Sequence, residues 1–588
     1  MLTVRALAGF QATRVKQPSC RALYGRGGVA QTFDYIIVGA GSAGCVLANR
    51  LSADSSRRVL LVEAGPADRH PMIHMPKGFG KIAASKEHAW YYEARPGVEG
   101  AQSTQTWITG RMLGGSSSLN GMQYQRGHSE DYDHWERDLG LEGWGWKEMS
   151  RVFRSMEDHE LGADGTRGAG GPLAVSVSNN HSFLMEKLVA AGAEMGLRYN
   201  RDANQPDHEG IGPINATIKN GRRWSSARAF LEPASKRPNL TVLTSTVVDR
   251  ICFEGNRAVG IECSNGSQTM QFRAEREVIM SAGTLNTTKL LQRSGVGDGQ
   301  TLSRLGIAVV RDLPGVGQNL REHVVLIMQF RLNGNYSQNP EYSGYRVALH
   351  GARYMLSHSG LLSYPPYDLA AFVKTRPNIS RPDATLVAAP MSVDLKAWKG
   401  FSGGIKLESE PGTQILGYTL QPQSQGSVNI TSSNAAAPLD IVHNFLAHPY
   451  DREVAIATVR YMRALFKQPA IRPYIKAETL PGDNVSSDEE ILAFCHMIAG
   501  PGYHVAGTCK MGNDELSVTD ERLRVRGLTG LRIADLSIAP TLTSGNTNGP
   551  AMAIGWRAAE LILEDVRLAA AAGTGSGADV STSRRAAS

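Results

Sequence analysis

The sequence has few cysteines and few long apolar stretches. Its six cysteines among 588 residues show no CxxC or paired spacing, so we expect reduced thiols and no metal site. No run of about 18 or more apolar residues occurs, so a transmembrane helix is not expected, although peripheral association with a membrane is compatible with the sequence. Apolar residues make up 41% and charged residues 20%, which excludes disordered and collagen-like classes.

Acidic residues are absent before Asp34, whereas five basic residues precede it. Spaced arginines among Ser, Ala and Gly are typical of a mitochondrial transit peptide, so residues 1–32 are predicted to be a leader and the protein to be mitochondrial. A disordered basic leader or a misassigned start codon is the alternative. Beyond the leader, the chain has 57 of its 62 basic residues and all 55 of its acidic residues. This near-neutral balance argues against nucleic acid as a partner.

A strand, a glycine turn and a helix are predicted near the start of the folded region. Residues 33–38 (FDYIIV) are predicted to be a short buried strand and end in GAGSAG at 39–44, which opens a helix; a second apolar strand ends at Glu63. The glycines permit a tight turn, close approach to a pyrophosphate and close helix packing, and the acid can bind ribose hydroxyls. The motif does not distinguish FAD from NAD. The residues predicted to bind the dinucleotide are Gly39, Gly41, Ser42, Gly44 and Glu63.

A second glycine-rich block, GRMLGGSSSLN, occupies residues 110–120. Small residues in such a run let backbone amides approach a flat ring or a phosphate, although a surface loop can have the same composition. The block resembles the first signature of the glucose–methanol–choline (GMC) family of FAD oxidoreductases. Further blocks at 281–297, 315–320, 534–535 and 544–548 also resemble the family, and the likeness covers about residues 33–563.

The resemblance implies an α/β plus α+β fold. A Rossmann-like FAD-binding region is expected at 33–324, and a discontinuous substrate domain is expected to have an antiparallel sheet with helices, mostly at 325–500. A C-terminal segment at 501–566 would return to the flavin. Residues 567–588 are rich in Ala, Gly, Ser and Thr and are predicted to be a flexible tail.

The resemblance also implies the cofactor and its mode of binding. Some family oxidases bond a histidine to the flavin at the position that Leu119 holds here, so non-covalent FAD is expected. Val248 resembles the residue whose backbone meets adenine, and Asp535 begins the segment that returns to the flavin. The further residues expected to bind FAD are Arg111, Gly114, Gly115, Ser116, Asn120, Gly121, Met122, Val248, Asp535 and Asn546.

Oxidation of an alcohol requires loss of the hydroxyl proton and transfer of a hydride from carbon to flavin N5. His504 lies in a segment, 503–512, that resembles the family's catalytic histidine segment. Imidazole titrates near neutrality, so His504 is the expected general base or alkoxide stabiliser. Asn548 is matched to the position of its partner. The expected reaction is oxidation of a primary alcohol to the aldehyde.

The substrate is less defined than the reaction. Tyr367, Asp368 and Trp398 offer the aromatic faces and carboxylate that would recognise a quaternary ammonium such as that of choline. Choline-acting members carry glutamate where Asp368 is aligned, and aspartate has a shorter reach. Choline, which would give betaine aldehyde, and another primary alcohol both stay open, and these side chains could simply pack in the sheet.

Three reaction classes are compared. A dehydrogenase that passes electrons to a quinone is the leading hypothesis, and an oxidase that reduces O₂ to H₂O₂ is the alternative. A carbon–carbon lyase such as a flavin-dependent photodecarboxylase is disfavoured, because those enzymes lack the histidine present at 504 and carry a cysteine where Leu420 is aligned.

Overall fold

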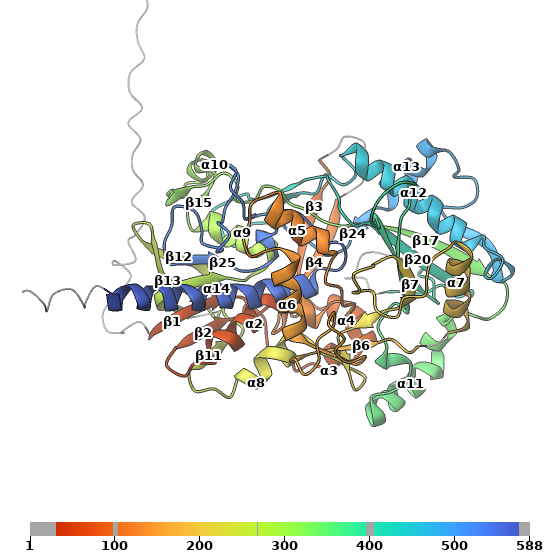
Figure 1. Cartoon of the computed structure of the whole chain (residues 1–588), viewed down its shortest axis with the longest axis horizontal. Coiled ribbons are helices and arrows are strands. Elements are labelled where there is room, and N and C mark those ends of the chain that lie inside the picture. Colours follow the sequence, from red (N-terminus) through yellow and green to blue (C-terminus); the bar gives the residue numbers. More distant parts are fainter. Residues whose placement is uncertain (1–30, 98–103, 181, 267, 396–404, 576–588) are drawn as a thin grey trace, which may run out of the picture.

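The computed structural model describes residues 31–97, 104–180, 182–266, 268–395 and 405–575. The predicted leader, except for its last two residues, and Trp398 lie outside these ranges. The two largest sheets lie toward opposite ends of the long axis of the molecule (Figure 1).

The first sheet contains the nucleotide-binding strands. Its order is β11-β2-β1-β14-β13-β12, and β25 pairs with the C-terminal half of β14. β1, β2, β11, β14 and β25 run parallel, whereas β12 and β13 form an antiparallel extension. The strands span Gln31–Val38 (β1), Val59–Val62 (β2), Leu240–Leu243 (β11), Val247–Glu254 (β12), Arg257–Ser264 (β13), Thr269–Met280 (β14) and Leu531–Ile533 (β25).

Two helices from opposite ends of the chain pack together against this sheet. α2 (Ser42–Leu51) follows β1, and α14 (Asn548–Gly575) returns from the C-terminal region to lie beside it (Figure 1). A side chain at Gly555 of α14 would lie 2.6 Å from the carbonyl oxygen of Ala43. This glycine therefore lets the two helix backbones approach closely.

The second large sheet is antiparallel throughout, with the order β23-β17-β20-β19-β18-β7 and β24 paired with β17. β7 comes from the earlier part of the chain, so the sheet is discontinuous in sequence. α12 (Pro449–Phe466) covers one face, and its apolar side packs on β20. The strands span Gly210–Pro213 (β7), Val324–Leu332 (β17), Leu369–Val373 (β18), Ala384–Ala389 (β19), Gly412–Thr419 (β20), Ile475–Leu480 (β23) and Gly500–Pro501 (β24).

A four-stranded sheet joins segments from the two halves of the chain. β3 (Ala89–Arg95) pairs with β4 (Gln105–Gly110) and with β22 (Leu439–Val442), and β22 pairs with β21 (Ser427–Ile430). Other helices are α5 (Ser129–Arg137), α6 (Trp146–Met156), α7 (Phe183–Glu194), α9 (Thr284–Arg293), α11 (Gly344–Ser357) and α13 (Asp488–Ile498).

Two predicted boundaries are corrected. β1 begins at Gln31, within the residues predicted to be leader, because its register with β14 extends back to that residue. α14 continues past residue 566 to Gly575, since alanine-rich sequence is a strong helix former even without a buried face. Among the helices in the described ranges, none is both long and apolar enough to cross a bilayer.

Candidate active site

The first glycine turn has the geometry that the motif predicts. Gly39 has φ +100°, and a Cβ there would lie 2.5 Å from the carbonyl oxygen of Ser281. A Cβ at Gly44 would lie 2.0 Å from the carbonyl oxygen of Gly39, so strand and helix can pack only with glycine here. At Gly41 a Cβ would meet Ser281 only at 3.8 Å. This side of the turn is therefore open to a group that approaches the backbone.

Glu63 lies at the end of β2 and braces the turn. Its two carboxylate oxygens accept the backbone N–H groups of Ala40 at 2.9 Å and of Gly65 at 2.8 Å. Burial raises the pKa of Glu63 to about 7, and these two hydrogen bonds partly offset the rise. The lone pairs that they leave can accept ribose hydroxyls.

The second glycine-rich block packs directly on the first. Gly115 has φ +51°, and a Cβ there would lie 2.8 Å from the Cα of Gly41. The backbone N–H of Gly114 donates to the carbonyl of Ala40 at 2.8 Å. Ser116 is exposed and accepts the N–H of Gly110. Two loops far apart in the sequence thus form one backbone-lined surface.

A buried arginine holds this surface in place. The Arg223 guanidinium donates to the carbonyl of Ser117 at 3.1 Å and to Asn120 Oδ1 at 2.8 Å. Asn120 Oδ1 also accepts the N–H of Met122, which has φ +63°. Beside them, a Cβ at Gly121 would lie 3.1 Å from Pro366. Sequence reasoning assigned no role to Arg223.

The donors at this surface fit a dinucleotide. No side chain caps the first turn of α2 and no acid lies in it, so its N–H groups are free to bind phosphate. Arg111 stacks on Trp90, and its buried Nε has no hydrogen-bond partner within the described part of the chain. An uncapped helix N-terminus and an unpaired guanidinium donor both suit an anionic pyrophosphate.

The remaining cofactor residues flank this surface. Asp535 follows β25 and accepts the N–H of Gly283 at 2.9 Å and the hydroxyl of Thr287 at 2.6 Å, so it ties the C-terminal segment to the start of α9. Burial raises the pKa of Asp535. Val248 is buried in β12, and nearby Thr246 donates its N–H to the carbonyl of Glu63. This backbone contact brings the start of β12, which contains Val248, next to Glu63, the predicted ribose-binding residue.

His504 and Asn546 form the centre of the candidate active site. His504 is buried, and its Nε2 lies 2.9 Å from Asn546 Nδ2. Tyr418 donates its hydroxyl to Asn546 Oδ1 at 2.9 Å. With Oδ1 turned to the hydroxyl, Nδ2 faces the imidazole, so both ends of the amide have a partner.

The predicted partner of His504 is corrected. Asn548 lies at the start of α14, and its Oδ1 accepts the hydroxyl of Ser42 at 2.7 Å. Asn548 therefore contacts the first glycine turn, and Asn546 contacts the imidazole. The two contacts differ from the predicted ones because the chain enters a helix between these residues, which sends alternate side chains in different directions.

A second histidine determines the tautomer of the first. His323 Nε2 lies 3.0 Å from the carbonyl oxygen of Leu420, which can only accept, so His323 Nδ1 carries the lone pair. His323 Nδ1 lies 2.9 Å from His504 Nδ1, which must then carry the proton. The lone pair of neutral His504 is thereby on Nε2, where it accepts an N–H of Asn546.

The electrostatics favour a neutral imidazole. Burial, and secondarily His323, holds the pKa of His504 well below its usual range. Burial also lowers the pKa of His323 to about 4. The backbone of His504 is anchored by Glu322, whose two oxygens accept its N–H at 2.7 and 3.0 Å. Burial raises the pKa of Glu322 to about 8. The site thus holds a base without a positive charge.

The antiparallel sheet brings these residues together. Val325 of β17 pairs with Tyr418 of β20, and Val324 pairs with Pro501 of β24. His323 immediately precedes β17 and His504 follows β24, so the strand register sets their separation. Sequence reasoning missed His323, Tyr418 and Glu322. The only sequence signal was a histidine placed between the 315–320 block and an apolar strand.

Of the predicted substrate residues, Asp368 lies near a lysine. Asp368 is buried; one oxygen accepts from Asn180 at 2.9 Å and the other has no hydrogen-bond partner among the described residues. Burial lowers the pKa of Lys77 to about 8, and the Asp368 carboxylate partly offsets the change. Burial conversely raises the pKa of Asp368, and Lys77 opposes that shift. Tyr367 packs beside Met122 in a separate apolar cluster, and burial raises its pKa to about 12.

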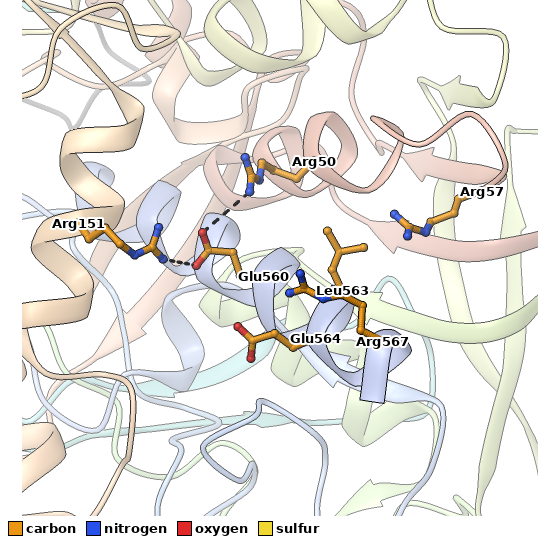
Figure 2. Close-up of a pocket in the computed structure, with 7 residues that line it drawn as sticks. All are labelled: Arg50, Arg57, Arg151, Glu560, Leu563, Glu564 and Arg567. Atoms are coloured by element: carbon orange, nitrogen blue, oxygen red, sulfur yellow. Dashed lines mark hydrogen bonds and ion pairs between the residues drawn. The ribbon is translucent and has the colours of Figure 1, made fainter. Parts of the chain in front are cut away.

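A polar pocket of about 430 Å³ lies elsewhere, between α2, α6 and α14 (Figure 2). Glu560, one of the two glutamates that line the pocket, forms ion pairs with Arg151 at 2.5 Å and with Arg50 at 3.9 Å. None of its lining residues is among the predicted site residues. These ion pairs join α14 to α2 and α6. The lining residues are Arg50, Arg57, Arg151, Glu560, Leu563, Glu564 and Arg567.

Comparison with known proteins identifies relatives over nearly the whole described chain. Two profiles of GMC oxidoreductases match residues 33–325 and 422–555. An alcohol dehydrogenase (acceptor) of Pseudomonas putida is 39% identical over 91% of this chain and 97% of its own length. Mouse mitochondrial choline dehydrogenase is 37% identical over 90% of this chain and 89% of its own. The solved structure of pyridoxine 4-oxidase from Mesorbium loti is 29% identical with a TM-score of 0.81, and the match covers 90% of this chain and 98% of that one.

These matches confirm the family resemblance and the mixed fold class that the sequence predicted. The two profile matches include both glycine-rich loops and the segment that holds His504 and Asn546. The chain therefore belongs to the GMC oxidoreductase family and is an FAD-dependent oxidoreductase.

Proposed function

We propose that this protein is an alcohol dehydrogenase that oxidises a primary alcohol to the aldehyde with His504 as the base and Asn546 as its partner. The observation that carries the proposal is the 2.9 Å contact between His504 Nε2 and Asn546 Nδ2. It sets a lone pair and an amide donor side by side in a buried site. A hydroxyl that replaces this hydrogen bond can give its proton to His504 Nε2 while its oxygen accepts an N–H from Asn546.

The residues around this pair have distinct tasks. His504 Nε2 takes the hydroxyl proton, and the second N–H of Asn546 stabilises charge that develops on the oxygen. His323 keeps the proton of His504 on Nδ1, and Tyr418 keeps the amide turned toward the site. Bound FAD supplies the acceptor for the hydride that leaves the carbinol carbon. Burial of both histidines excludes water.

We infer further that FAD is bound without a covalent link. Leu119 occupies the end of the second glycine-rich block, where its aliphatic side chain packs in a small apolar cluster with Met112 and Ile108. A leucine offers no nucleophile to a flavin. The sites proposed to hold FAD are the two glycine loops, the first turn of α2 and Arg111.

The substrate is proposed to be an uncharged primary alcohol in preference to choline. Lys77 lies near Asp368, the carboxylate that choline would need, and the ammonium opposes a second cation there. Tyr367 adds an apolar and aromatic surface next to Met122. A neutral apolar chain can bind this surface without the free-energy cost of removing water from a charged group.

The test uses two alcohols of nearly the same shape, choline and 3,3-dimethylbutan-1-ol. Under anaerobic conditions the proposal expects flavin bleaching by the neutral alcohol and much weaker bleaching by choline. Preferential bleaching by choline would reject the substrate proposal alone. His504→Ala should retain FAD and slow bleaching by about 10²- to 10⁴-fold, the usual worth of a general base. Unchanged bleaching would reject His504 as the base.

The electron acceptor and location are proposed separately. We propose a quinone as the acceptor, so flavin reduced by an alcohol should reoxidise faster with a soluble quinone than with air; the reverse order would favour an oxidase.

We propose a mitochondrial location from the composition of residues 1–32. Fusion of these residues to a fluorescent protein tests it, and a cytosolic signal would reject it.

A further inference from the structure

The helix α11 presents an apolar face to the outside of the molecule. Tyr345 is 73% exposed, Leu349 61% and Leu356 88%. At 100° per residue these positions lie on one side of the helix, together with exposed Ala348, Ala352 and Met355. Tyr354, on the opposite side, is the buried residue of the helix. The helix is therefore amphipathic with its apolar side turned away from the core.

Figure 1 shows α11, in green at the lower right, projecting from the body of the molecule. Its inner side is fixed to the rest of the protein, because the Tyr354 hydroxyl donates to the carbonyl of His74 at 3.2 Å. The segments before and after the helix contact it through short 3₁₀ turns at Asn339–Tyr342 and Leu361–Ser363. These contacts hold α11 against the protein with its apolar face exposed.

Basic side chains flank this face. Arg346 and Arg353 lie along the same edge of the apolar stripe, at about 80° to 100° from its centre. Arg346 pairs with Glu341 at 2.6 Å, and His350 pairs with the same glutamate at 2.9 Å. Arg353 is exposed and donates to the hydroxyl of Ser359.

We propose that α11 docks on an anionic lipid surface, with Tyr345, Leu349 and Leu356 inserted among the acyl chains and the arginines at the headgroups. An apolar helical face bordered by arginine is the pattern of helices that lie in the membrane interface. A second copy of this chain is a poorer occupant, because a symmetric contact would bring the same arginines against each other.

The position of α11 places the lipid surface next to the candidate substrate site. Tyr342, one residue before the N-cap of the helix, lies with its ring centre 5.9 Å from Lys77 Nζ. The segment after the helix leads to Pro366, which packs against Gly121 of the second glycine-rich block, and then to Asp368. Docking through α11 would therefore bring the region of Lys77 and Asp368 close to the headgroup layer.

The test is co-sedimentation of the full-length holoenzyme with vesicles of phosphatidylcholine and phosphatidylglycerol. The double variant Leu349→Glu/Leu356→Glu should bind roughly tenfold more weakly or worse, because two apolar anchors become charged. Met497→Glu/Leu568→Glu is the matched control. These residues are 67% and 65% exposed on other helices, and this variant should bind like the wild type. The basic leader is the same in all variants.

Each outcome decides the proposal. Wild-type protein that stays in the supernatant, or equal loss in both double variants, would overturn it. If the α11 variant only converts a dimer to a monomer in sedimentation velocity, the face is a contact between copies and the proposal also fails. Equal wild-type binding to pure phosphatidylcholine would overturn the role of charge. Bleaching by a soluble alcohol should be unchanged in every variant, so failure here leaves the proposed reaction untouched.

Discussion

Asn546 Nδ2 lies 2.9 Å from His504 Nε2, although these residues come from separate segments of the C-terminal region. The contact is held from both sides, by Tyr418 on the amide and by His323 on the imidazole. A base and a donor that are already oriented need little rearrangement when the substrate enters. This preorganisation is the usual source of rate enhancement at such sites.

The two neighbouring asparagines should behave differently when truncated. Asn546→Ala should lower kcat by about 10²- to 10³-fold, the usual loss when a donor to a developing oxyanion is removed. Asn548→Ala removes a contact to Ser42 and should mainly weaken FAD retention. Steady-state kinetics and flavin content of the purified variants measure both effects. Equal loss of kcat at constant flavin content would contradict these separate roles.

His323 should act by fixing the tautomer of His504. His323→Ala should lower kcat by roughly 10- to 100-fold, the range for groups that orient a functional histidine. His323→Gln should restore part of the rate, because its amide can donate to the carbonyl of Leu420 and accept from His504 Nδ1. A merely structural role predicts no such rescue. If both variants are equally slow at equal thermal stability, the positioning role is rejected.

The preference against cationic alcohols should depend on pH through Lys77. Its pKa is lowered to about 8, so the ammonium loses its charge as pH rises through that value. The ratio of kcat/KM for choline to that for 3,3-dimethylbutan-1-ol should therefore rise between about pH 7 and pH 9. Choline is charged throughout this range, so its own titration does not contribute.

Lys77→Met is the control for this pH effect. The variant should accept choline better at pH 7 and should lose the pH dependence of the ratio. A ratio that still rises with pH in Lys77→Met would assign the titration to another group.

Substitution at Gly115 should separate steric crowding from backbone strain. Gly115→Ala combines a positive φ of 51° with a contact of 2.8 Å to Gly41, so it should push the two glycine loops apart and weaken FAD binding. Gly255→Ala has a similar φ of 60° but no neighbour within 4 Å. It should cost only about 1 kcal/mol from strain and leave flavin content unchanged. Thermal unfolding and absorbance near 450 nm measure the difference; equal flavin loss in both would reject the steric explanation.

The proposal that FAD is bound without a covalent link predicts a simple chemical result. Precipitation of the holoenzyme with acid should release all of the FAD into the supernatant, because unfolding removes every non-covalent contact. A yellow pellet would demonstrate a bond to some side chain other than Leu119.

Much of the nucleotide site could be predicted because its physical requirements are local. Gly39, Gly41 and Gly44 stand at fixed spacing between a strand and a helix. Only glycine satisfies the contacts made at Gly39 and Gly44, and Gly41 leaves its side of the turn open. The second glycine-rich block was recognisable by composition and resemblance, and so was the antiparallel sheet of the substrate region. The boundaries at Gln31 and Gly575 were less predictable, since strand register and helix propagation do not end at a change of composition.

The order of residues along the chain therefore determined the cofactor class and the fold, because glycine contacts and strand–turn–helix order act over short distances, and it indicated His504 as the candidate base. Only the tertiary structure decided that Asn546 and not Asn548 meets His504, that His323 sets the position of its proton, and that Lys77 lies near Asp368. These relationships depend on how strands β17, β20 and β24 pair and on where α14 begins. Contacts of this kind join residues between 42 and nearly 300 positions apart along the chain, where spacing in the sequence carries no directional information.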